Sequence, residues 1–322
     1  MTTVTSYQEV LETEISKINL PEHPKNLYDP LRYFLTLGGK RTRPTLTLLG
    51  CQLFGVPGIK AINAAIAVEL FHNFTLIHDD IMDKAPLRRG KPTVHEKWDT
   101  NIGILSGDVL FVEAYKYLAK HETDVLPKLI EVFSKTAVEV CEGQQMDMDF
   151  ETRDDISIEA YIEMIRLKTS VLLGAALKMG GIVAKASDED LDLLYKFGVN
   201  VGIAFQLQDD YLDLFADPEK FGKQVGGDII SNKKTFLLLK AEELAAGEDK
   251  KEFKSILSES NQANKVKHAQ ILFKKLEVDS LAKKKMEEYY HNAKDYISKI
   301  QLSDDQKEPL LSLANYLMHR DV

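Results

Sequence analysis

The stretches Asp79-Asp80-Ile81-Met82-Asp83 and Asp209-Asp210-Tyr211-Leu212-Asp213 are two Asp-Asp-x-x-Asp clusters in apolar segments with helical periodicity. Positions i and i+4 share one face of a helix, so Asp79 stands over Asp83 and Asp209 over Asp213. Like charges at this spacing destabilise a helix unless a cation lies between them. Carboxylate oxygens suit Mg²⁺, which proteins usually hold through one or two carboxylates together with waters and substrate phosphates. The clusters therefore predict a cavity with carboxylates on each wall and a Mg²⁺-bridged diphosphate inside it.

The composition is that of an ordinary globular chain, with 322 residues, 44% hydrophobic and 28% charged. The net charge of −9 argues against nucleic-acid binding as the main function. The two cysteines, Cys51 and Cys141, match no metal-ligand spacing, and we expect both to be small buried thiols in a reducing compartment. There is no signal-peptide pattern and no apolar run of roughly 18 residues. We therefore expect a cytoplasmic protein without stable membrane insertion.

The apolar periodicity is helical nearly throughout the chain. No alternating run of β-branched residues predicts a strand, and no Pro-, Gly- or Ser-rich linker divides the chain. The sequence predicts one all-α domain over residues 1–322, with Lys84–Asp99 irregular, a helix start at Ser106 and a polar loop at 217–232. The expected helices are 6–18, 27–37, 44–54, 61–82, 109–120, 125–150, 157–180, 188–216, 233–246, 250–258, 264–273, 277–298 and 303–319.

Three groups of basic residues accompany the acidic clusters. The first is Gly38-Gly39-Lys40-Arg41-Thr42-Arg43-Pro44, where glycine permits close backbone approach and arginine offers a fork that matches phosphate oxygens. The second is Arg88-Arg89-Gly90, expected in a flexible loop after the first cluster. The third is Lys223, Lys233 and Lys234, after the second cluster. Solvent exposure is the commoner explanation for any single group, but their placement beside acidic clusters favours phosphate binding.

Isolated polar residues in apolar helices allow two interpretations. His72 lies two helical turns before the first cluster, where a histidine is more often a hydrogen-bonded core residue than a ligand. Lys168, next to Thr169, either extends outward to solvent or reaches the cavity. Gln206, three residues before Asp209, either faces the same cavity or makes an ordinary polar contact.

In order and spacing, these motifs resemble those of the trans-isoprenyl diphosphate synthases, also called polyprenyl synthetases, over essentially the whole chain. The resemblance rests on the motifs above together with Phe205–Asp213 and Phe221-Gly222-Lys223. It implies the isoprenoid synthase fold, an antiparallel helix bundle around a deep central cavity, usually as a homodimer. It also implies a short-chain prenyltransferase that joins isopentenyl diphosphate to dimethylallyl, geranyl or farnesyl diphosphate.

The resemblance further implies a role for each motif residue. The Mg²⁺ ligands would be Asp79, Asp83 and Asp209, with Asp80, Asp210 and Asp213 in or beside the same sites, for about three ions with diphosphate bound. The allylic diphosphate would be held by Arg88, Lys168, Lys223 and Lys233, and isopentenyl diphosphate by Lys40, Arg41, His72 and Arg89. Thr169 and Gln206 would face the developing carbocation, and Arg320 would close over the site. Ionisation of the allylic carbon–oxygen bond would precede attack by the isopentenyl double bond and proton loss to pyrophosphate.

The residues before the first cluster indicate the product length. Phe74 and Thr75 lie five and four positions before Asp79, so Phe74 is roughly 7.5 Å down the helix axis. A chain growing away from the metal would meet this ring early. Phe74 therefore predicts a farnesyl (15-carbon) or geranylgeranyl (20-carbon) product. Phe74 alone does not decide between them, because Thr75 is small; we favour geranylgeranyl diphosphate, and plain core packing of Phe74 is the alternative.

Other functions stay open at this point. A class I terpene cyclase also has an Asp-rich cluster, but its second metal motif differs and it needs no second diphosphate site. A non-catalytic subunit of a heteromeric synthase would be expected to lose an Asp cluster. A helical Mg²⁺-dependent phosphohydrolase has no use for two separate basic groups. A synthase of longer products would keep the chemistry and change only the length.

Overall fold

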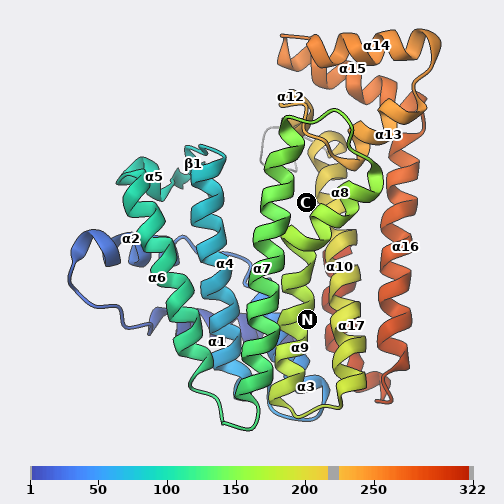
Figure 1. Cartoon of the computed structure of the whole chain (residues 1–322). Coiled ribbons are helices and arrows are strands. Elements are labelled where there is room, and N and C mark those ends of the chain that lie inside the picture. The colour runs from blue at the N-terminus through green and yellow to red at the C-terminus, as the bar shows by residue number, and fades with distance from the viewer. Residues whose placement is uncertain (1, 217–224, 319–322) are drawn as a thin grey trace. The chain divides into compact units, whose positions relative to one another are not determined.

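The computed structural model describes residues 2–216 and 225–318, which are helical almost throughout (Figure 1). The expected all-α fold class is confirmed. The first half contains α1 (Thr2–Ser16), α2 (Lys25–Thr36), α3 (Thr42–Leu53), η1 (Gly58–Ala61), α4 (Ile62–Met82), β1 (Leu87–Arg88), β2 (Lys91–Pro92), α5 (Val94–Lys97), α6 (Thr100–Leu118) and α7 (Leu126–Glu151). The second contains α8 (Ile158–Ile165), η2 (Arg166–Ser170), α9 (Val171–Val183), α10 (Asp188–Phe215), α12 (Gly227–Ile230), α13 (Phe236–Leu244), α14 (Gly247–Ser258), α15 (Gln262–Lys275), α16 (Val278–Lys299) and α17 (Asp304–Met318).

The chain forms two compact units. Unit 1 consists of Met1–Ser134, Ala175–Asp192 and Leu302–Leu311. Unit 2 consists of Lys135–Gly174, Leu193–Gln301 and Ser312–Val322. Helices α7, α9, α10 and α17 each contribute residues to both units.

Unit 1 is built around α4, which packs chiefly against α6 and α3. Val68, Leu70 and Phe71 of α4 are at most 1% exposed. A further apolar cluster joins α1, α3 and the start of α4; it consists of Leu11, Leu48, Cys51, Ala61 and Ala65. Burial along α4 holds the helix whose C-terminal end carries the first Asp cluster.

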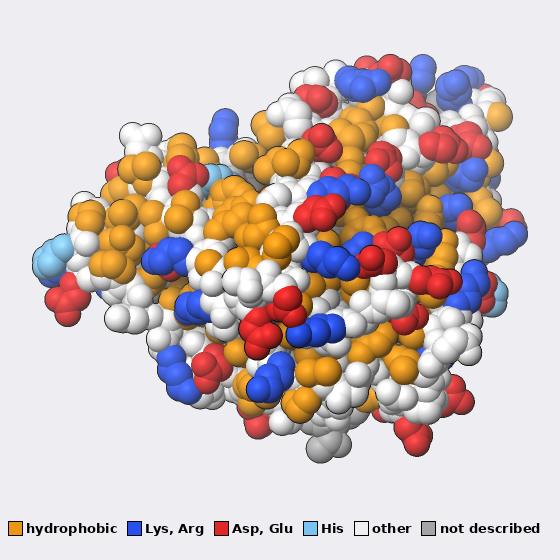
Figure 2. All heavy atoms as spheres, turned by 60° about the horizontal axis from the view of Figure 1, so that its bottom comes forward, with side chains coloured by type: hydrophobic (Ala, Val, Ile, Leu, Met, Phe, Trp, Pro, Cys, Tyr) orange, Lys and Arg blue, Asp and Glu red, His pale blue; other side chains and the backbone are white. Residues whose placement is uncertain are grey.

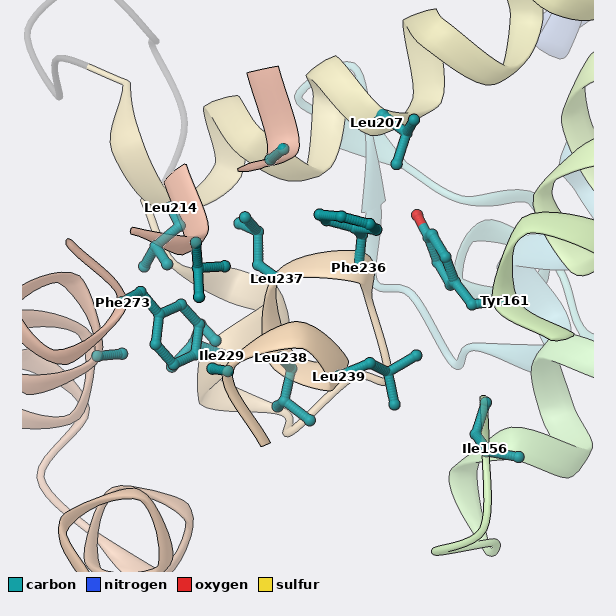
Figure 3. Packing of buried hydrophobic residues seen from close by; sticks show 14 of the residues in the cluster. Ile156, Tyr161, Leu207, Leu214, Ile229, Phe236, Leu237, Leu238, Leu239 and Phe273 are labelled. Atoms are coloured by element: carbon teal, nitrogen blue, oxygen red, sulfur yellow. The ribbon is translucent and has the colours of Figure 1, made fainter. Parts of the chain in front are cut away.

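Unit 2 has its own apolar core, part of which is seen in Figure 3. The run Phe236–Leu239 of α13 packs there with Leu207 of α10 and Phe273 of α15. Tyr161 of α8 lies in the same cluster, with its hydroxyl directed toward the part of α10 that carries Leu207 (Figure 3). This core therefore supports the helix that carries the second Asp cluster.

Three local expectations were wrong. Helix α6 begins at Thr100 rather than near Ser106, because Asp99 caps it by accepting a hydrogen bond of 2.8 Å from the Ile102 N–H. The stretch predicted as irregular contains a short antiparallel hairpin of β1 and β2. Cys51 is buried as expected, but Cys141 is exposed.

On the face shown in Figure 2, hydrophobic side chains gather in several patches, with basic and acidic side chains around and between them. Within the described ranges, no helix combines the length and the apolar composition needed to span a bilayer.

Candidate functional site

The first Asp cluster ends α4 in unit 1, and its members differ in their surroundings. The side chain of Asp80 is 2% exposed, and its two oxygens each accept a hydrogen bond of 2.8 Å from the Nε of Arg88. Asp79 is partly exposed, with its Oδ2 at 3.6 Å from the same guanidinium, and Asp83 is exposed. The pair predicted to share a helix face is thus more accessible than the aspartate beside it.

Arg88 reaches α4 because it sits in the hairpin. Leu87 pairs with Pro92 and Arg88 with Lys91, and the turn residues Arg89 and Gly90 have φ of 53° and 73°. Two positive φ values in a two-residue loop are the mark of a type I′ turn. This segment, expected to be a flexible loop, is therefore a defined turn that presents both arginines.

The loop before α3 contacts the same hairpin. Gly38 and Gly39 have φ of 75° and 146°, and the Arg89 guanidinium donates a hydrogen bond to the Gly38 carbonyl. A Cβ built on Gly39 would lie 2.9 Å from the Nη2 of Arg89. The positive φ therefore favours glycine at position 39, and a Cβ there would also displace the Arg89 guanidinium.

The two arginines of this loop have different roles. Arg41 is fully engaged inside unit 1, because its guanidinium binds Glu12 and Glu69 and its side chain is 1% exposed. Arg43 instead lies with its Nη1 at 3.1 Å from the Nε2 of His72. Among the described residues, the buried Nε of Arg43 has no hydrogen-bond partner. Arg43, which the sequence-based assignment of roles passed over, is therefore better placed than Arg41 to receive an anion.

Arg41 should instead matter for stability. Replacing it by Met is expected to lower the free energy of unfolding by about 3 kcal/mol, since Glu69 would keep a buried charge without its guanidinium. Urea unfolding would measure the loss. Lys17→Met breaks an exposed pair with Glu14 and serves as the control, with an expected change of at most about 0.5 kcal/mol. Equal losses in the two variants would contradict this role for Arg41.

His72 lies in a strongly positive environment. Burial of the ring lowers its pKa well below the usual value, and the charges of Arg43, Arg89, Arg88 and Arg41 lower it further. A neutral imidazole surrounded by guanidinium groups marks a place where an anion would be stabilised. Arg89 also lines a pocket of about 550 Å³ with Tyr33, Lys91 and Lys97.

The second Asp cluster, on α10 in unit 2, has a similar arrangement. Asp210 is 6% exposed. Its Oδ2 accepts a hydrogen bond from the Tyr161 hydroxyl, and its Oδ1 accepts one of 3.1 Å from the Gln206 amide nitrogen. Asp209 and Asp213 are partly exposed, and the Asp213 Oδ2 accepts a hydrogen bond of 3.0 Å from the Asp228 N–H. In both clusters the second aspartate is therefore held inside the protein.

Lys168 and Thr169 lie in a π-helical segment, η2, that interrupts the helix expected at 157–180. Such segments often occur at functional sites. Gly143 of α7 packs against η2 so closely that an added Cβ would lie 2.2 Å from the Lys168 backbone nitrogen. The Lys168 Nζ lies 2.6 Å from Asp147, and the Lys233 Nζ lies 3.8 Å from the same carboxylate. The Thr169 hydroxyl donates a hydrogen bond of 3.3 Å to the Gln206 amide oxygen.

Acidic groups crowd this part of unit 2. The pKa of Asp210 is raised to about 7, chiefly by burial and then by the Asp228 carboxylate, although hydrogen bonds from Tyr161 and Gln206 oppose the shift. The pKa of Asp228 is raised to about 6, chiefly by burial; Lys233 lowers it, whereas Asp213 and Asp147 raise it. Additional positive charge would stabilise these carboxylates in their ionised form.

The residues fit a hard divalent cation. The donors in both clusters are carboxylate oxygens. In unit 2 the Asp213 and Asp147 carboxylates raise the pKa of Asp228, and a bound cation would relieve this repulsion. Over the ranges that the structure describes, no three His, Cys, Asp or Glu side chains form a complete metal site by themselves. Mg²⁺ takes much of its coordination from phosphates and water, and the rest from carboxylates of the kind in these clusters.

The sequence-predicted residues fall into one group in each unit. Unit 1 brings together His72, Arg88 and Arg89 with the loop that contains Lys40, and unit 2 brings together Lys168, Thr169, Gln206 and Lys233. Lys223 and Arg320 lie outside the described residues. The sequence did not predict roles for Asp147, Tyr161 and Asp228. Of these, only Asp147 could have been found from the local sequence, because it lies one helical turn after Gly143 on α7.

Comparisons with known proteins agree with this picture. Residues 24–274 match the family model described as Polyprenyl synthetase, a range with residues in both units. A geranylgeranyl diphosphate synthase of Methanosarcina mazei is 46% identical over 220 residues, covering 68% of each chain. A geranylfarnesyl diphosphate synthase of Natronomonas pharaonis is 39% identical over 256 residues, covering 73% of this chain and 74% of that one. A crystal structure of a geranylgeranyl pyrophosphate synthase, 46% identical, superimposes with a TM-score of 0.95 over 99% of both chains.

Proposed function

Because the chain belongs to the polyprenyl synthetase family and is a prenyltransferase, we propose that it condenses isopentenyl diphosphate with an allylic diphosphate in a Mg²⁺-dependent reaction. The observation that carries the proposal is the shared design of the two clusters. In each, the second aspartate is bonded to protein, while the first and last lie together on another helix face and are more exposed. Two accessible carboxylates on one helix face can bind the same cation.

The unit 1 cations are suited to isopentenyl diphosphate. We assign its diphosphate to Lys40, Arg43, His72 and Arg89. Arg41, the arginine first assigned to this role, supports the loop through Glu12 and Glu69. Guanidinium forks match phosphate oxygens, and the unpartnered buried Nε of Arg43, among the described residues, would gain an acceptor there.

In unit 2 the allylic diphosphate is assigned to Lys168 and Lys233, together with Asp209 and Asp213 acting through Mg²⁺. In unit 1 the same kind of contact is assigned to Arg88, together with Asp79 and Asp83 acting through Mg²⁺. When bound, Mg²⁺ would supply Lewis-acid stabilisation of the departing pyrophosphate. Arg88, Lys168 and Lys233 would add fixed positive charge as the carbon–oxygen bond breaks. Thr169 and Gln206 present oxygen atoms in unit 2 that suit a neighbouring carbocation. The pyrophosphate would then accept the proton lost after carbon–carbon bond formation.

Incubation with isopentenyl diphosphate, Mg²⁺ and each allylic primer in turn tests this function. Product chain lengths are resolved by chromatography. We expect a discrete prenyl diphosphate from at least one primer among dimethylallyl, geranyl and farnesyl diphosphate. A folded protein that condenses none of them would favour the alternative of a non-catalytic subunit.

For product length we propose geranylgeranyl diphosphate over farnesyl diphosphate. Phe74 of α4 stacks on Phe111 of α6 at 5.0 Å between ring centroids with an interplanar angle of 10°, and Phe71 lies 5.6 Å away. This packing supports the ring in unit 1, five residues before Asp79. A ring held in this way can end a growing chain, whereas longer products would need it to move.

Phe74→Ala is expected to lengthen the product by at least one five-carbon unit, because truncation opens space beside Thr75 and Phe111. Chromatography of the extracted products measures the shift. Phe54→Ala, a partly buried phenylalanine of the same unit outside α4, is the control and should leave the distribution unchanged. If Phe74→Ala leaves the distribution of product chain lengths unchanged, Phe74 is an ordinary packing residue and does not limit the product.

We also propose that the protein is a homodimer formed through α6. Ile104, Leu105 and Val112 are 41%, 58% and 59% exposed and share one face of this helix, together with Asp108. Exposed apolar stripes of this kind mark association surfaces. A two-fold axis places the stripe of one protomer in contact with the same stripe of its partner.

Val112→Glu is expected to convert the dimer to a monomer, because it places a charge in this stripe. Light scattering would report the mass. Ile271→Glu changes an apolar residue of α15, 54% exposed, and should keep the dimer. A wild-type protein that is monomeric at micromolar concentration would reject the proposed interface.

A further inference from the structure

A continuous chain of hydrogen bonds runs through unit 2 from Tyr161 to Thr169. The Tyr161 hydroxyl donates to one oxygen of Asp210, and the Gln206 amide nitrogen donates to the other at 3.1 Å. The Gln206 amide oxygen accepts from the Thr169 hydroxyl at 3.3 Å. Tyr161 is 1% exposed and Asp210 is 6% exposed, so the first two members of the chain are fixed inside the protein.

This chain determines which way the Gln206 amide points. In its ionised form the Asp210 carboxylate can only accept hydrogen bonds, so the amide group beside it is the NH₂. The amide oxygen is then directed to the other side, where Thr169 lies. The reversed amide would set two acceptors against each other at Asp210 and two donors against each other at Thr169, unless the hydroxyl turned away.

Both oxygens of Asp210 are occupied by this arrangement. Tyr161 holds one of them from α8, and the aromatic ring is fixed by the unit 2 core (Figure 3). Gln206, one helical turn before Asp210 on α10, holds the other. Asp210 therefore makes its hydrogen bonds inside the protein, whereas Asp209 and Asp213 lie on the more exposed face of the helix.

We propose that Tyr161 and Asp210 are positioning residues that aim the amide oxygen of Gln206, and that Asp210 is not itself a metal ligand. The inference rests on the proposed function, in which Thr169 and Gln206 face the developing carbocation. An oxygen stabilises positive charge, whereas an amide NH₂ would oppose it. Preorganised dipoles of this kind lower the barrier because they need not reorient during the reaction.

Tyr161→Phe removes the hydroxyl and keeps the ring in the core. We expect kcat to fall about tenfold while KM for both diphosphates changes less than about twofold, because the lost interaction acts in the transition state. Tyr289→Phe, which changes another tyrosine packed against the same core, should leave both constants unchanged. If Tyr161→Phe does not fold, Asp210→Asn carries the same test, since it removes one of the two acceptors.

A double-mutant cycle with Gln206→Leu separates positioning from a general structural role. In the Gln206→Leu background, adding Tyr161→Phe should lower kcat by less than about twofold, because the amide that Tyr161 helps to orient is no longer present. Additive losses would overturn the inference while leaving the proposed function intact. Absence of condensation by the wild-type protein would instead overturn the proposed function and this inference with it.

Metal binding provides a readout that does not depend on turnover. Mn²⁺ affinity in the presence of inorganic pyrophosphate can be followed by electron paramagnetic resonance. We expect Tyr161→Phe and Asp210→Asn to weaken it less than about threefold, and Asp209→Asn to weaken it more than about thirtyfold. A loss in Asp210→Asn as large as that in Asp209→Asn would make Asp210 a ligand and overturn the inference.

Discussion

Replacing Asp209 by Asn is expected to lower kcat about a thousandfold, the scale found when a group that stabilises transition-state charge is lost. The substitution keeps the shape of the side chain and removes its charge. Asp209 shares a helix face with Asp213, and both are partly exposed. The folded structure should therefore persist while the leaving pyrophosphate loses part of its stabilisation.

Steady-state rates at saturating substrates and a titration of Mg²⁺ would measure the effect. The Mg²⁺ concentration needed for half-maximal rate should rise with the substitution, and excess Mg²⁺ should restore part of the rate. Asp295→Asn, an exposed aspartate of α16, is the matched control and should behave as wild type. A loss below about tenfold, with unchanged Mg²⁺ dependence, would remove Asp209 from the metal site.

Gly143→Ala is expected to lower kcat about a hundredfold, because small misplacements of reacting groups are costly. The added Cβ would lie 2.2 Å from the Lys168 backbone nitrogen, a distance that forces η2 away from α7. Lys168 and Thr169 would move together, and the contact of Lys168 with Asp147 would be disturbed. Overpacking of this kind should also cost about 1–3 kcal/mol of stability.

Gly247→Ala is the control for the added methyl group. An added Cβ there meets no atom within 4 Å, and its φ of 53° adds only local strain, so stability should fall slightly and kcat should not change. Urea unfolding and steady-state kinetics would separate the two effects. Full activity in Gly143→Ala would show that the position of η2 is not critical.

The sequence was sufficient for the helical fold and for the two acidic clusters, because both are local patterns. Helical periodicity and turn residues predict α4 and α10 to within a few residues. The i, i+4 spacing also separates Asp79 and Asp83 from Asp80, which the structure places against Arg88. Local spacing thus predicts which aspartates of each cluster share a helix face.

What the sequence could not predict depends on partners far apart in the chain. Tyr161 reaches Asp210 across 49 positions, and Arg41 reaches Glu69 across 28. Nothing local distinguishes Arg41 from Arg43, so their different roles became visible only with Glu12, Glu69 and His72 in place. Likewise, η2 arises where the helix packs against Gly143, a tertiary contact that single-helix periodicity does not encode.

The proposed condensation is tested by mass spectrometry of the product from farnesyl diphosphate and deuterated isopentenyl diphosphate, with Mg²⁺ or with excess chelator. We expect one 20-carbon diphosphate that carries a single labelled five-carbon unit, formed only with Mg²⁺. Farnesol with pyrophosphate as the sole products would indicate a hydrolase, and unchanged substrates would indicate a non-catalytic subunit. Either of those results would contradict the proposed function.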